Sequence, residues 1–183
     1  MTKVRLDRFD NSEYTPGSLV KRGLWYVAQP VLISSVIPWP SALKRLFLRL
    51  FGASIARGVV IKPRVRIKYP WKLTVGAHSW IGEGVWIDNL DDVTIGAHCC
   101  ISQGAYLLCG NHDYSIVTFD LITRPIVMED GSWVGAQSIL GPGAVLGTEA
   151  VLTAGSVGLG ALSPHHIHQG NPAEPVRKRE IQP

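Results

Sequence analysis

His112 is the residue of this 183-residue chain best suited to acid–base chemistry. It lies in the segment Gly110-Asn-His-Asp-Tyr114, with aliphatic residues on both sides. Imidazole titrates near neutral pH, so a positioned histidine can take a proton from a hydroxyl group and pass it to a leaving group. A lone loop histidine is more often an ordinary surface residue than a catalytic one. Only the surrounding segment can distinguish the two roles. We expect the neighbouring Asp113 to shape the loop rather than to take a proton.

The other histidines and the cysteines do not follow the spacing of a metal site. His165, His166 and His168 match no standard zinc pattern, and Pro164 favours a loop there. The three cysteines are Cys99, Cys100 and Cys109, which form no CxxC pair and no paired framework. We therefore expect no metal, free thiols, and a reducing, cytoplasmic location.

Composition narrows the class of protein. Hydrophobic residues make up 46% of the chain and charged residues 17%, which excludes disorder as the main state. Nineteen glycines and twelve prolines oppose a helical bundle, because both residues break helices. The net charge of +4 is modest and the basic residues form only short clusters, so we expect no nucleic-acid partner.

An internal repeat predicts the fold. From residue 55 onward, aliphatic residues recur every six positions. The positions are Ile55, Ile61, Ile67, Val75, Ile81, Ile87, Ile95, Ile101, Leu107, Met128, Val134, Leu140, Leu146 and Leu152. Six residues per strand and corner, three per circuit, predict a triangular prism of parallel strands, the hexapeptide parallel β-helix. Small residues dominate four positions after the aliphatics and should also point inward, which makes Cys99 a buried, unreactive thiol.

One interruption of the repeat is the place to look for chemistry. The first coils are twenty residues long, so each has two extra residues at one corner, and later coils shorten to eighteen. Between Leu107 and Met128 the period is lost, and we expect residues 108–126 to form an expelled loop. Loops positioned by a rigid scaffold commonly carry function. His112 lies inside this loop.

The chain divides into three predicted regions: an N-terminal helical region at 1–52, the β-helix at 53–163, and a C-terminal tail at 164–183. In the first region, Ser18 could cap a helix that runs to about Gln29 and breaks at Pro30. Ser41 is expected to cap a second helix that Gly52 ends.

The two N-terminal helices have two competing interpretations. They either seal the first coil of the prism or contact an anionic membrane through Lys44, Arg45 and Arg49. We favour the seal, with at most weak peripheral membrane contact. The uncharged run Leu24–Ile37 has fourteen residues, which is too short to span a bilayer that needs roughly twenty.

Motifs along nearly the whole chain resemble one enzyme family. They are RFDNSEYTPG, RLFGASIARGVVIKPRVRIKYPW, VWIDNLDDVTIG, CISQGAYLLCGNHDY, PIVMEDGSWVGAQSIL, VLTAGSV and QGNPA. The sequence is similar to the hexapeptide-repeat acetyltransferases of the maltose, galactoside and nodulation-factor type, and most of all to the group that acts in colanic acid biosynthesis. The resemblance implies an all-β solenoid, a left-handed parallel β-helix with N-terminal α-helices, and a homotrimer with active sites between neighbouring prisms.

The resemblance also implies an activity. It implies an O-acetyltransferase that uses acetyl-CoA as co-substrate and acts on a sugar hydroxyl of an exopolysaccharide or glycan precursor. His112 would be the general base of a direct transfer. Asp88 and Asn89, at the corner of a twenty-residue coil, would help to build the site against a neighbouring chain. An Asx-turn at that corner explains the same two residues equally well.

For acetyl-CoA, the resemblance implies a set of residues on later coils and in the tail. They are Trp133, Gly135, Ala136, Ala154, Gly155, Arg177 and Lys178. Small residues would let the pantetheine chain approach the backbone, and basic side chains suit phosphates. The solenoid itself also demands small residues. Gly160 stands where related enzymes often carry a lysine, so phosphate contact from that position is not expected.

Three other functions are alternatives for this sequence. An antibiotic O-acetyltransferase would differ only in its acceptor, which the sequence does not name. A zinc lyase of the γ-carbonic-anhydrase type needs two histidines five positions apart, but the fifth residue after His112 is Val117. A non-catalytic trimeric scaffold would have no need of the Gly-Asn-His-Asp-Tyr segment in an expelled loop.

Overall fold

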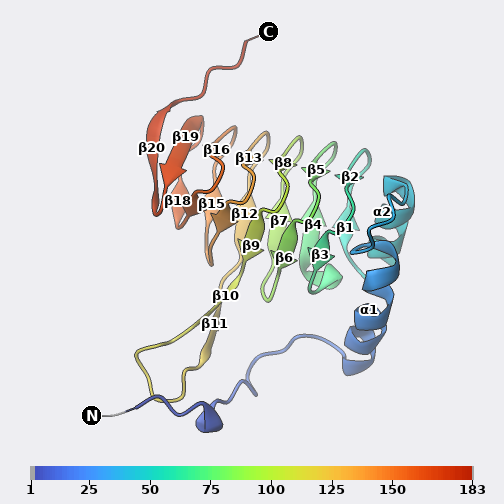
Figure 1. The fold of residues 1–183 in the computed structure, drawn as a ribbon, viewed down its shortest axis with the longest axis vertical. Coiled ribbons are helices and arrows are strands. Elements are labelled where there is room, and N and C mark those ends of the chain that lie inside the picture. Colours follow the sequence, from blue (N-terminus) through green and yellow to red (C-terminus); the bar gives the residue numbers. More distant parts are fainter. Residues whose placement is uncertain (1–2, 183) are drawn as a thin grey trace.

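The computed structural model describes residues 3–182 as a parallel β-solenoid with helices at one end (Figure 1). Three sheets form the faces of the prism. Sheet A contains β1 (Ser54–Ile55), β4 (Leu73–Val75), β7 (Val93–Ile95), β12 (Ile126–Met128), β15 (Val145–Leu146) and β18 (Ala161–Leu162). Sheet B contains β2 (Val60–Ile61), β5 (Trp80–Ile81), β8 (Cys100–Ile101), β13 (Trp133–Val134), β16 (Val151–Leu152), β19 (His166–Gly170) and β20 (Ala173–Lys178). Sheet C contains β3 (Arg66–Ile67), β6 (Trp86–Asp88), β9 (Tyr106–Leu108), β14 (Ile139–Leu140) and β17 (Val157–Gly158).

The predicted inward column is confirmed. Ile55 pairs with Val75, and Val75 pairs with Ile95, so equivalent residues of successive coils stack directly. All fourteen aliphatic positions are buried, with at most 4% of any side chain exposed. Parallel strands lie about 4.8 Å apart, so each side chain contacts its equivalents in the coils above and below. Cys99 lies in the buried small-residue column, as expected.

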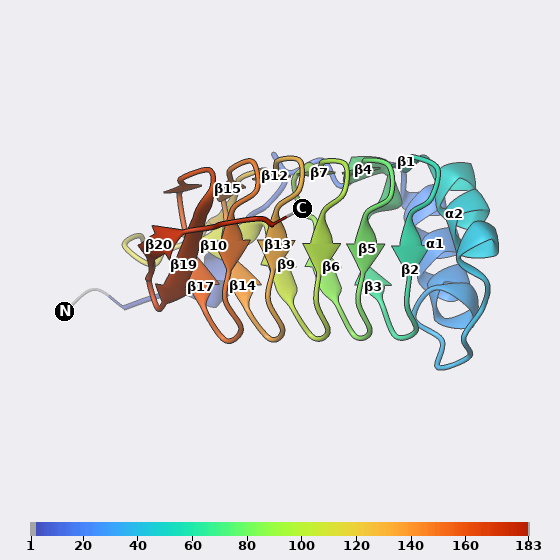
Figure 2. The same cartoon turned by 90° about the horizontal axis from the view of Figure 1, so that it is seen from above.

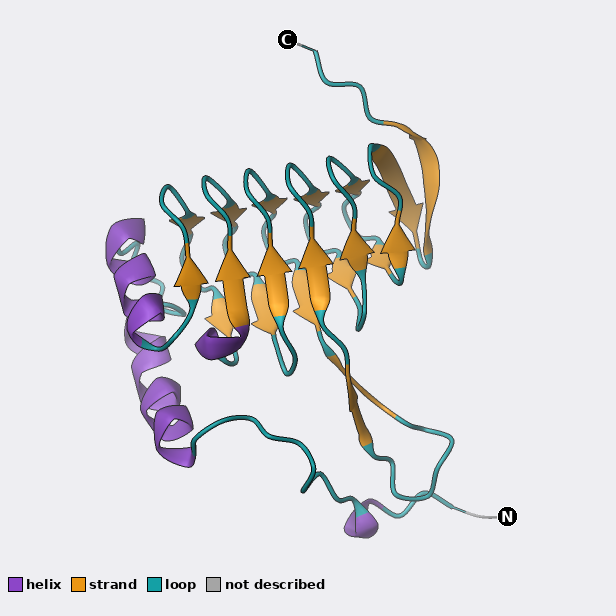
Figure 3. Ribbon diagram, turned by 180° about the vertical axis from the view of Figure 1, so that it is seen from behind, coloured by secondary structure: helices purple, strands orange, loops and turns teal. Residues whose placement is uncertain are grey.

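The extra residues of the early coils all lie where sheet C leads into sheet A, the C–A corner. The first coil places a 3-10 turn there, η2 (Pro70–Lys72), and the second places residues 89–92 there. In the third coil, the expelled loop leaves the prism from this corner (Figure 3). Its stem is an antiparallel hairpin of β10 (Gly110–His112) and β11 (Leu121–Thr123).

The N-terminal region contains η1 (Leu6–Arg8), α1 (Leu19–Leu32) and α2 (Ser41–Leu50). The two α-helices cover the end of the prism beside the first coil, opposite β19 and β20 (Figure 2). The expected break at Pro30 is wrong, because α1 continues to Leu32. Proline lacks only its own amide donor, and a single missing bond near the end of a helix is tolerated.

Ser41 has a different role from the predicted cap. It is the first residue of α2, and its hydroxyl accepts a hydrogen bond from the Ile61 amide at 3.0 Å. Gly52 follows the end of α2 with φ +94°, a left-handed conformation that glycine adopts without strain. The predicted end of the helix is thus confirmed.

Basic side chains of α2 pair with the open strand edges of the first coil. Lys44, Arg45 and Arg49 all donate to backbone carbonyl oxygens there. The bonds run from Lys44 Nζ to Ile61 O (3.3 Å) and Lys62 O (2.9 Å), from Arg45 to Val59 O (2.7 Å), and from Arg49 Nε to Ile55 O (2.8 Å). The hypothesis that these three cations face an anionic membrane is therefore wrong.

Helix α1 completes the same seal over β3. The Trp25 indole donates to Ile67 O at 2.9 Å, and the Gln29 side chain accepts from Ile67 N at 2.7 Å. The Trp25 ring also packs against Phe47 and Phe51, with centroids 5.9 and 5.0 Å away. Buried polar backbone groups need partners, and the two helices supply them where the next strand would otherwise stand.

We predict that Lys44→Met lowers the free energy of unfolding by about 1–3 kcal/mol, because the Ile61 and Lys62 carbonyl oxygens then lose their buried donor. Denaturant unfolding followed by circular dichroism measures the change. Lys62→Met is the matched control, since the Lys62 side chain is exposed. Equal stability of the two variants would contradict the role of Lys44 in the seal.

Candidate active site

His112 is held in one orientation by its own loop. Its side chain is half-buried on β10, and Nδ1 lies 2.8 Å from the carbonyl oxygen of Phe119. The ring stacks on that of Phe119 with centroids 4.4 Å apart and an interplanar angle of 9°. A carbonyl oxygen only accepts hydrogen bonds, so Nδ1 carries the proton and Nε2 of the neutral ring keeps a free lone pair. That is the form a general base requires.

The rest of the loop is ordered by short-range contacts. Asp113 Oδ1 accepts from both the amide and the hydroxyl of Ser115, and these bonds lower the pKa of Asp113. The Arg5 amide donates to Val117 O at 2.8 Å, so the N-terminal segment runs beside the loop, as Figure 1 also shows. Asp113 therefore shapes the loop, as expected.

Gly110 has a role that the sequence reasoning missed. It begins β10 at the point where the hairpin leaves the prism, and a Cβ atom there would collide with the Leu90 side chain. Without a Cβ at residue 110, the Leu90 side chain can keep its place beside the hairpin; a larger residue there would require Leu90 to move. The glycine in the Gly-Asn-His sequence was the available signal.

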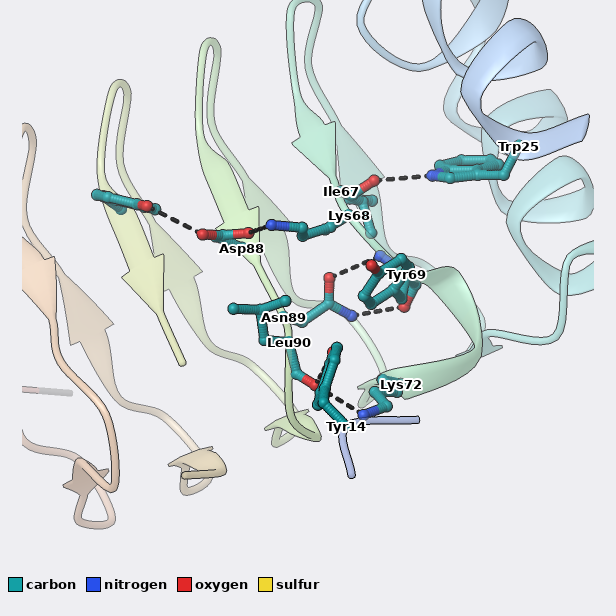
Figure 4. Close-up of polar contacts among 10 residues, drawn as sticks. Tyr14, Trp25, Ile67, Lys68, Tyr69, Lys72, Asp88, Asn89 and Leu90 are labelled. Carbon is teal, nitrogen blue, oxygen red and sulfur yellow. Dashed lines mark hydrogen bonds and ion pairs between the residues drawn. The ribbon is translucent and has the colours of Figure 1, made fainter. Parts of the chain in front are cut away.

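Asp88 is nearly buried and has two partners on sheet C (Figure 4). The Tyr106 hydroxyl donates to Oδ2 at 3.2 Å, and Lys68 Nζ forms an ion pair with Oδ1 at 3.0 Å. Burial raises the pKa of Tyr106 to about 12, so its hydroxyl stays a donor. Among the described residues, the buried Oδ1 atom has no partner with hydrogen-bond geometry; Lys68 is close to it but poorly directed.

Asn89 is fully buried and has a structural role at its corner. Its amide donates to Tyr69 O at 2.5 Å and accepts from Tyr69 N at 3.0 Å, which joins two successive corners (Figure 4). In this chain the His112 ring nitrogen is held by the Phe119 carbonyl, and no contact of it with Asp88 or Asn89 is found among residues 3–182. The catalytic roles of Asp88 and Asn89 stay predictions.

His112 and Asp88 line adjoining parts of one depression. The His112 hollow has a volume of about 510 Å³, and the Asp88 hollow about 600 Å³. Residues lining both are Arg22, Lys68 and Tyr69. The N-terminal segment, through Phe9 and Tyr14, forms the outer wall beside His112. The C–A corner and α1 thus build a site that could take an elongated acceptor.

The residues expected to hold acetyl-CoA lie on another side of the prism. Trp133 is 44% exposed on sheet B, and its indole donates to Ser102 Oγ at 2.9 Å. The small residues follow on the two corners that lead from sheet B to sheet C, where the Gly155 amide donates to Ala136 O at 2.9 Å. Space is open around Gly155, whereas a Cβ on Gly135 would collide with the backbone at Ala154.

The basic residues of the C-terminal hairpin divide into two kinds. Arg177 and Lys178 are exposed on β20, where the residues pair antiparallel with β19. Arg179 instead forms an ion pair with Glu149 at 3.1 Å and donates to Gly131 O at 2.9 Å. Arg177 and Lys178 have no ion-pair partner within the described part of the chain, so both remain available for phosphates.

The remaining histidines and cysteines are explained by local structure. His78 and His98 stack on the outside with centroids 5.3 Å apart, as their twenty-residue separation predicts. His166 and His168 contact nearby backbone carbonyls. Burial raises the pKa of Cys99, and raises that of Cys109 to about 12. No group of three or more metal-binding side chains is found among residues 3–182. No helix in that range has the length and apolar character needed to cross a bilayer.

Comparison with known proteins identifies relatives. No family model matches the chain. WcaF of Escherichia coli (strain K12), named as a colanic acid biosynthesis acetyltransferase, is 38% identical over 167 residues, which covers 89% of this chain and 90% of WcaF.

Solved structures share the fold. A hexapeptide-repeat acetyltransferase of Vibrio cholerae O1 biovar eltor, complexed with acetyl-coenzyme A, has a TM-score of 0.79 at 20% identity and covers 88% of both chains. A galactoside acetyltransferase in complex with coenzyme A has a TM-score of 0.77 at 18% identity, covering 87% of this chain and 80% of that one. These likenesses establish the solenoid, and the 38% identity to WcaF extends over nearly the whole chain. The chain therefore belongs to the hexapeptide-repeat acetyltransferase family.

Proposed function

We propose that this protein is an acetyl-CoA-dependent O-acetyltransferase that acts on a sugar hydroxyl of an exopolysaccharide or glycan precursor. The observation that carries the proposal is the hydrogen bond from His112 Nδ1 to Phe119 O, which leaves Nε2 as a base at the edge of a hollow. The name of WcaF, which refers to colanic acid biosynthesis, supports a polysaccharide precursor as the acceptor.

The proposed reaction is a direct transfer. The acceptor hydroxyl gives its proton to His112 Nε2 while its oxygen attacks the thioester carbonyl carbon. The bond from that carbon to sulfur then breaks, and the imidazolium returns the proton to the leaving thiolate. The Phe119 carbonyl stabilises the imidazolium because it accepts from Nδ1 throughout. No covalent enzyme intermediate is needed.

Acetyl-CoA is proposed to lie along sheet B and its corner with sheet C. Trp133, Gly135, Ala136, Ala154 and Gly155 would meet the pantetheine chain. On β20, Arg177 and Lys178 would meet the nucleotide phosphates. The complexes of the two structural neighbours with acetyl-coenzyme A and coenzyme A support this co-substrate.

The separation of these two groups supports the proposed homotrimer with shared sites. His112 leaves the prism from the C–A corner, whereas the proposed acetyl-CoA residues lie on sheet B and the next corner. One prism keeps them apart, and a neighbouring prism can bring them together. Exposed Trp80 and Trp133 on sheet B, at 58% and 44%, give that face an apolar surface suited to contact.

The alternatives receive less support. An antibiotic acceptor would use the same chemistry, and no observation favours it. A non-catalytic scaffold does not explain a histidine whose tautomer is set within an expelled loop. Peripheral membrane contact remains part of the proposal, but it would have to use α1, because the basic residues of α2 are already bonded to the first coil.

We predict that His112→Ala lowers kcat by at least about 10²-fold, since the lost contribution is general-base help. The assay follows thiol release from acetyl-CoA with a panel of glycan intermediates. His78→Ala is the matched control, because His78 is an exposed histidine on the outer surface. A His112→Ala variant with near-wild-type kcat on its acceptor would remove His112 from the mechanism.

We predict that replacing Arg177 and Lys178 by Ala raises the KM for acetyl-CoA about tenfold, through loss of charge-assisted bonds to phosphate. The KM for acetyl-pantetheine, which lacks the nucleotide, should stay unchanged in the same variant. Arg57→Ala, at an exposed corner of the first coil, is the control. An equal rise for both thioesters would argue against phosphate contact.

We predict a particle of three times the 20.0-kDa chain mass by light scattering. We expect His112→Ala and Trp133→Ala each to lower activity, and co-expression of the two to restore part of it, because mixed trimers contain sites with both residues intact. The same variants purified separately and mixed without subunit exchange serve as the control. An active monomer, or no recovery in verified mixed trimers, would refute shared sites.

A further inference from the structure

The Asp88 hollow contains more positive charge than its carboxylate can balance. Arg22 comes from α1, and Arg66 and Lys68 come from β3 and the residue after it. Asp88 is the only carboxylate that lines the hollow, and it already pairs with Lys68. Within residues 3–182, the Arg22 and Arg66 side chains have neither an ion pair nor a hydrogen bond. Two guanidinium groups are therefore free to bind an anion.

Arg66 is held in place without losing its donors. Its guanidinium lies 4.3 Å from the centroid of the Trp86 ring, which in turn stacks on Tyr106 at 4.5 Å. A guanidinium over an aromatic face directs its N–H groups sideways, in its own plane, where they can bond a phosphate in pairs.

The Lys68–Asp88 ion pair could rearrange when a ligand binds in the hollow. Asp88 Oδ1 is buried without hydrogen-bond geometry to any described group, and Lys68 lies above it at 3.0 Å (Figure 4). The Lys68 side chain is 40% exposed. If it turns toward an incoming phosphate, Asp88 Oδ1 becomes free to accept from a sugar hydroxyl. The hollow thus offers one place for an anion and another for a sugar.

Exposed apolar side chains of α1 line this hollow beside Arg22. Leu19 and Tyr26, which are 75% and 80% exposed, both belong to its lining. A second apolar stripe, 60–74% exposed, lies on another side of the helix, roughly opposite Arg22 at about 100° per residue; it consists of Val20, Leu24, Val27 and Val31. Exposed apolar side chains next to free guanidinium groups favour a ligand that has both a phosphate and a hydrocarbon chain.

We propose that the Asp88 hollow binds the phosphate of a lipid-linked glycosyl phosphate, with Arg22 and Arg66 as the phosphate ligands and Leu19 and Tyr26 against the hydrocarbon. This inference rests on the proposed function and names its acceptor class. The adjoining His112 hollow would then receive the sugar, since Arg22, Lys68 and Tyr69 line both parts.

The test is a binding experiment that needs no acetyl transfer. Full-length protein is sedimented with phosphatidylcholine vesicles that contain a small fraction of polyprenyl phosphate. Vesicles with the same charge from phosphatidylglycerol form the control arm. We expect preferential binding to the polyprenyl phosphate vesicles, reduced about tenfold or more in the Arg22→Ala/Arg66→Met variant. The methionine keeps packing over Trp86, and thermal unfolding verifies the fold.

Three further measurements make the result specific. Arg57→Ala should bind like the wild type, because Arg57 lies on another corner. Soluble hexose 1-phosphate should compete with the vesicles, which shows that phosphate is recognised. Leu19→Ser/Tyr26→Ser should weaken vesicle binding while the particle mass stays the same.

Several outcomes would overturn the inference. Equal binding to phosphatidylglycerol vesicles would mean general charge attraction, and an indifferent Arg22/Arg66 variant would mean that the hollow is not the site. A change of particle mass in the Leu19/Tyr26 variant would make these two residues part of an interface between copies. Acetyl transfer is measured separately by thiol release, so failure of the proposed function leaves this binding result interpretable.

Discussion

The stacked aliphatic column inside the prism is the interaction on which every other feature depends. Each inward residue contacts its equivalents one coil above and below, so neighbouring coils cannot slip by one residue without turning these side chains outward. The C–A corners are thereby aligned, and Asn89 can reach the Tyr69 backbone. The expelled loop leaves from the third of these aligned corners. The position of His112 is a consequence of packing that lies wholly inside the prism.

The chemistry of the site depends on backbone groups as much as on side chains. The Phe119 carbonyl selects the His112 tautomer that carries its proton on Nδ1, and the absence of a Cβ at Gly110 leaves room for the Leu90 side chain. Neither constraint requires a second ionisable residue beside His112. The charged residues are instead collected in the hollow beside α1, where they suit recognition rather than proton transfer.

The repeat could be predicted from sequence because its period reflects a single packing rule applied to every coil. The expelled loop could also be predicted, because a segment without the six-residue period cannot continue the coils of the prism. The partner of His112 could not be predicted, because a carbonyl oxygen leaves no mark in residue types. The seal by the N-terminal helices was favoured from the sequence, but the acceptors of Lys44, Arg45 and Arg49 could not be predicted for a related reason: they are backbone atoms of the first coil, not a charged partner. Continuation of α1 past Pro30 was missed because the cost of proline depends on its distance from the helix end.

Both ends of the solenoid carry features that oppose end-to-end stacking of copies. A prism of parallel strands with bare edges would accept another prism end to end, and the contact would repeat without limit. At the first coil, edge carbonyls are occupied by cationic side chains of α2. At the other end, β20 turns back antiparallel on β19 and becomes the edge of sheet B, where Pro175 offers no amide donor to a further strand. Both features disfavour growth into fibres.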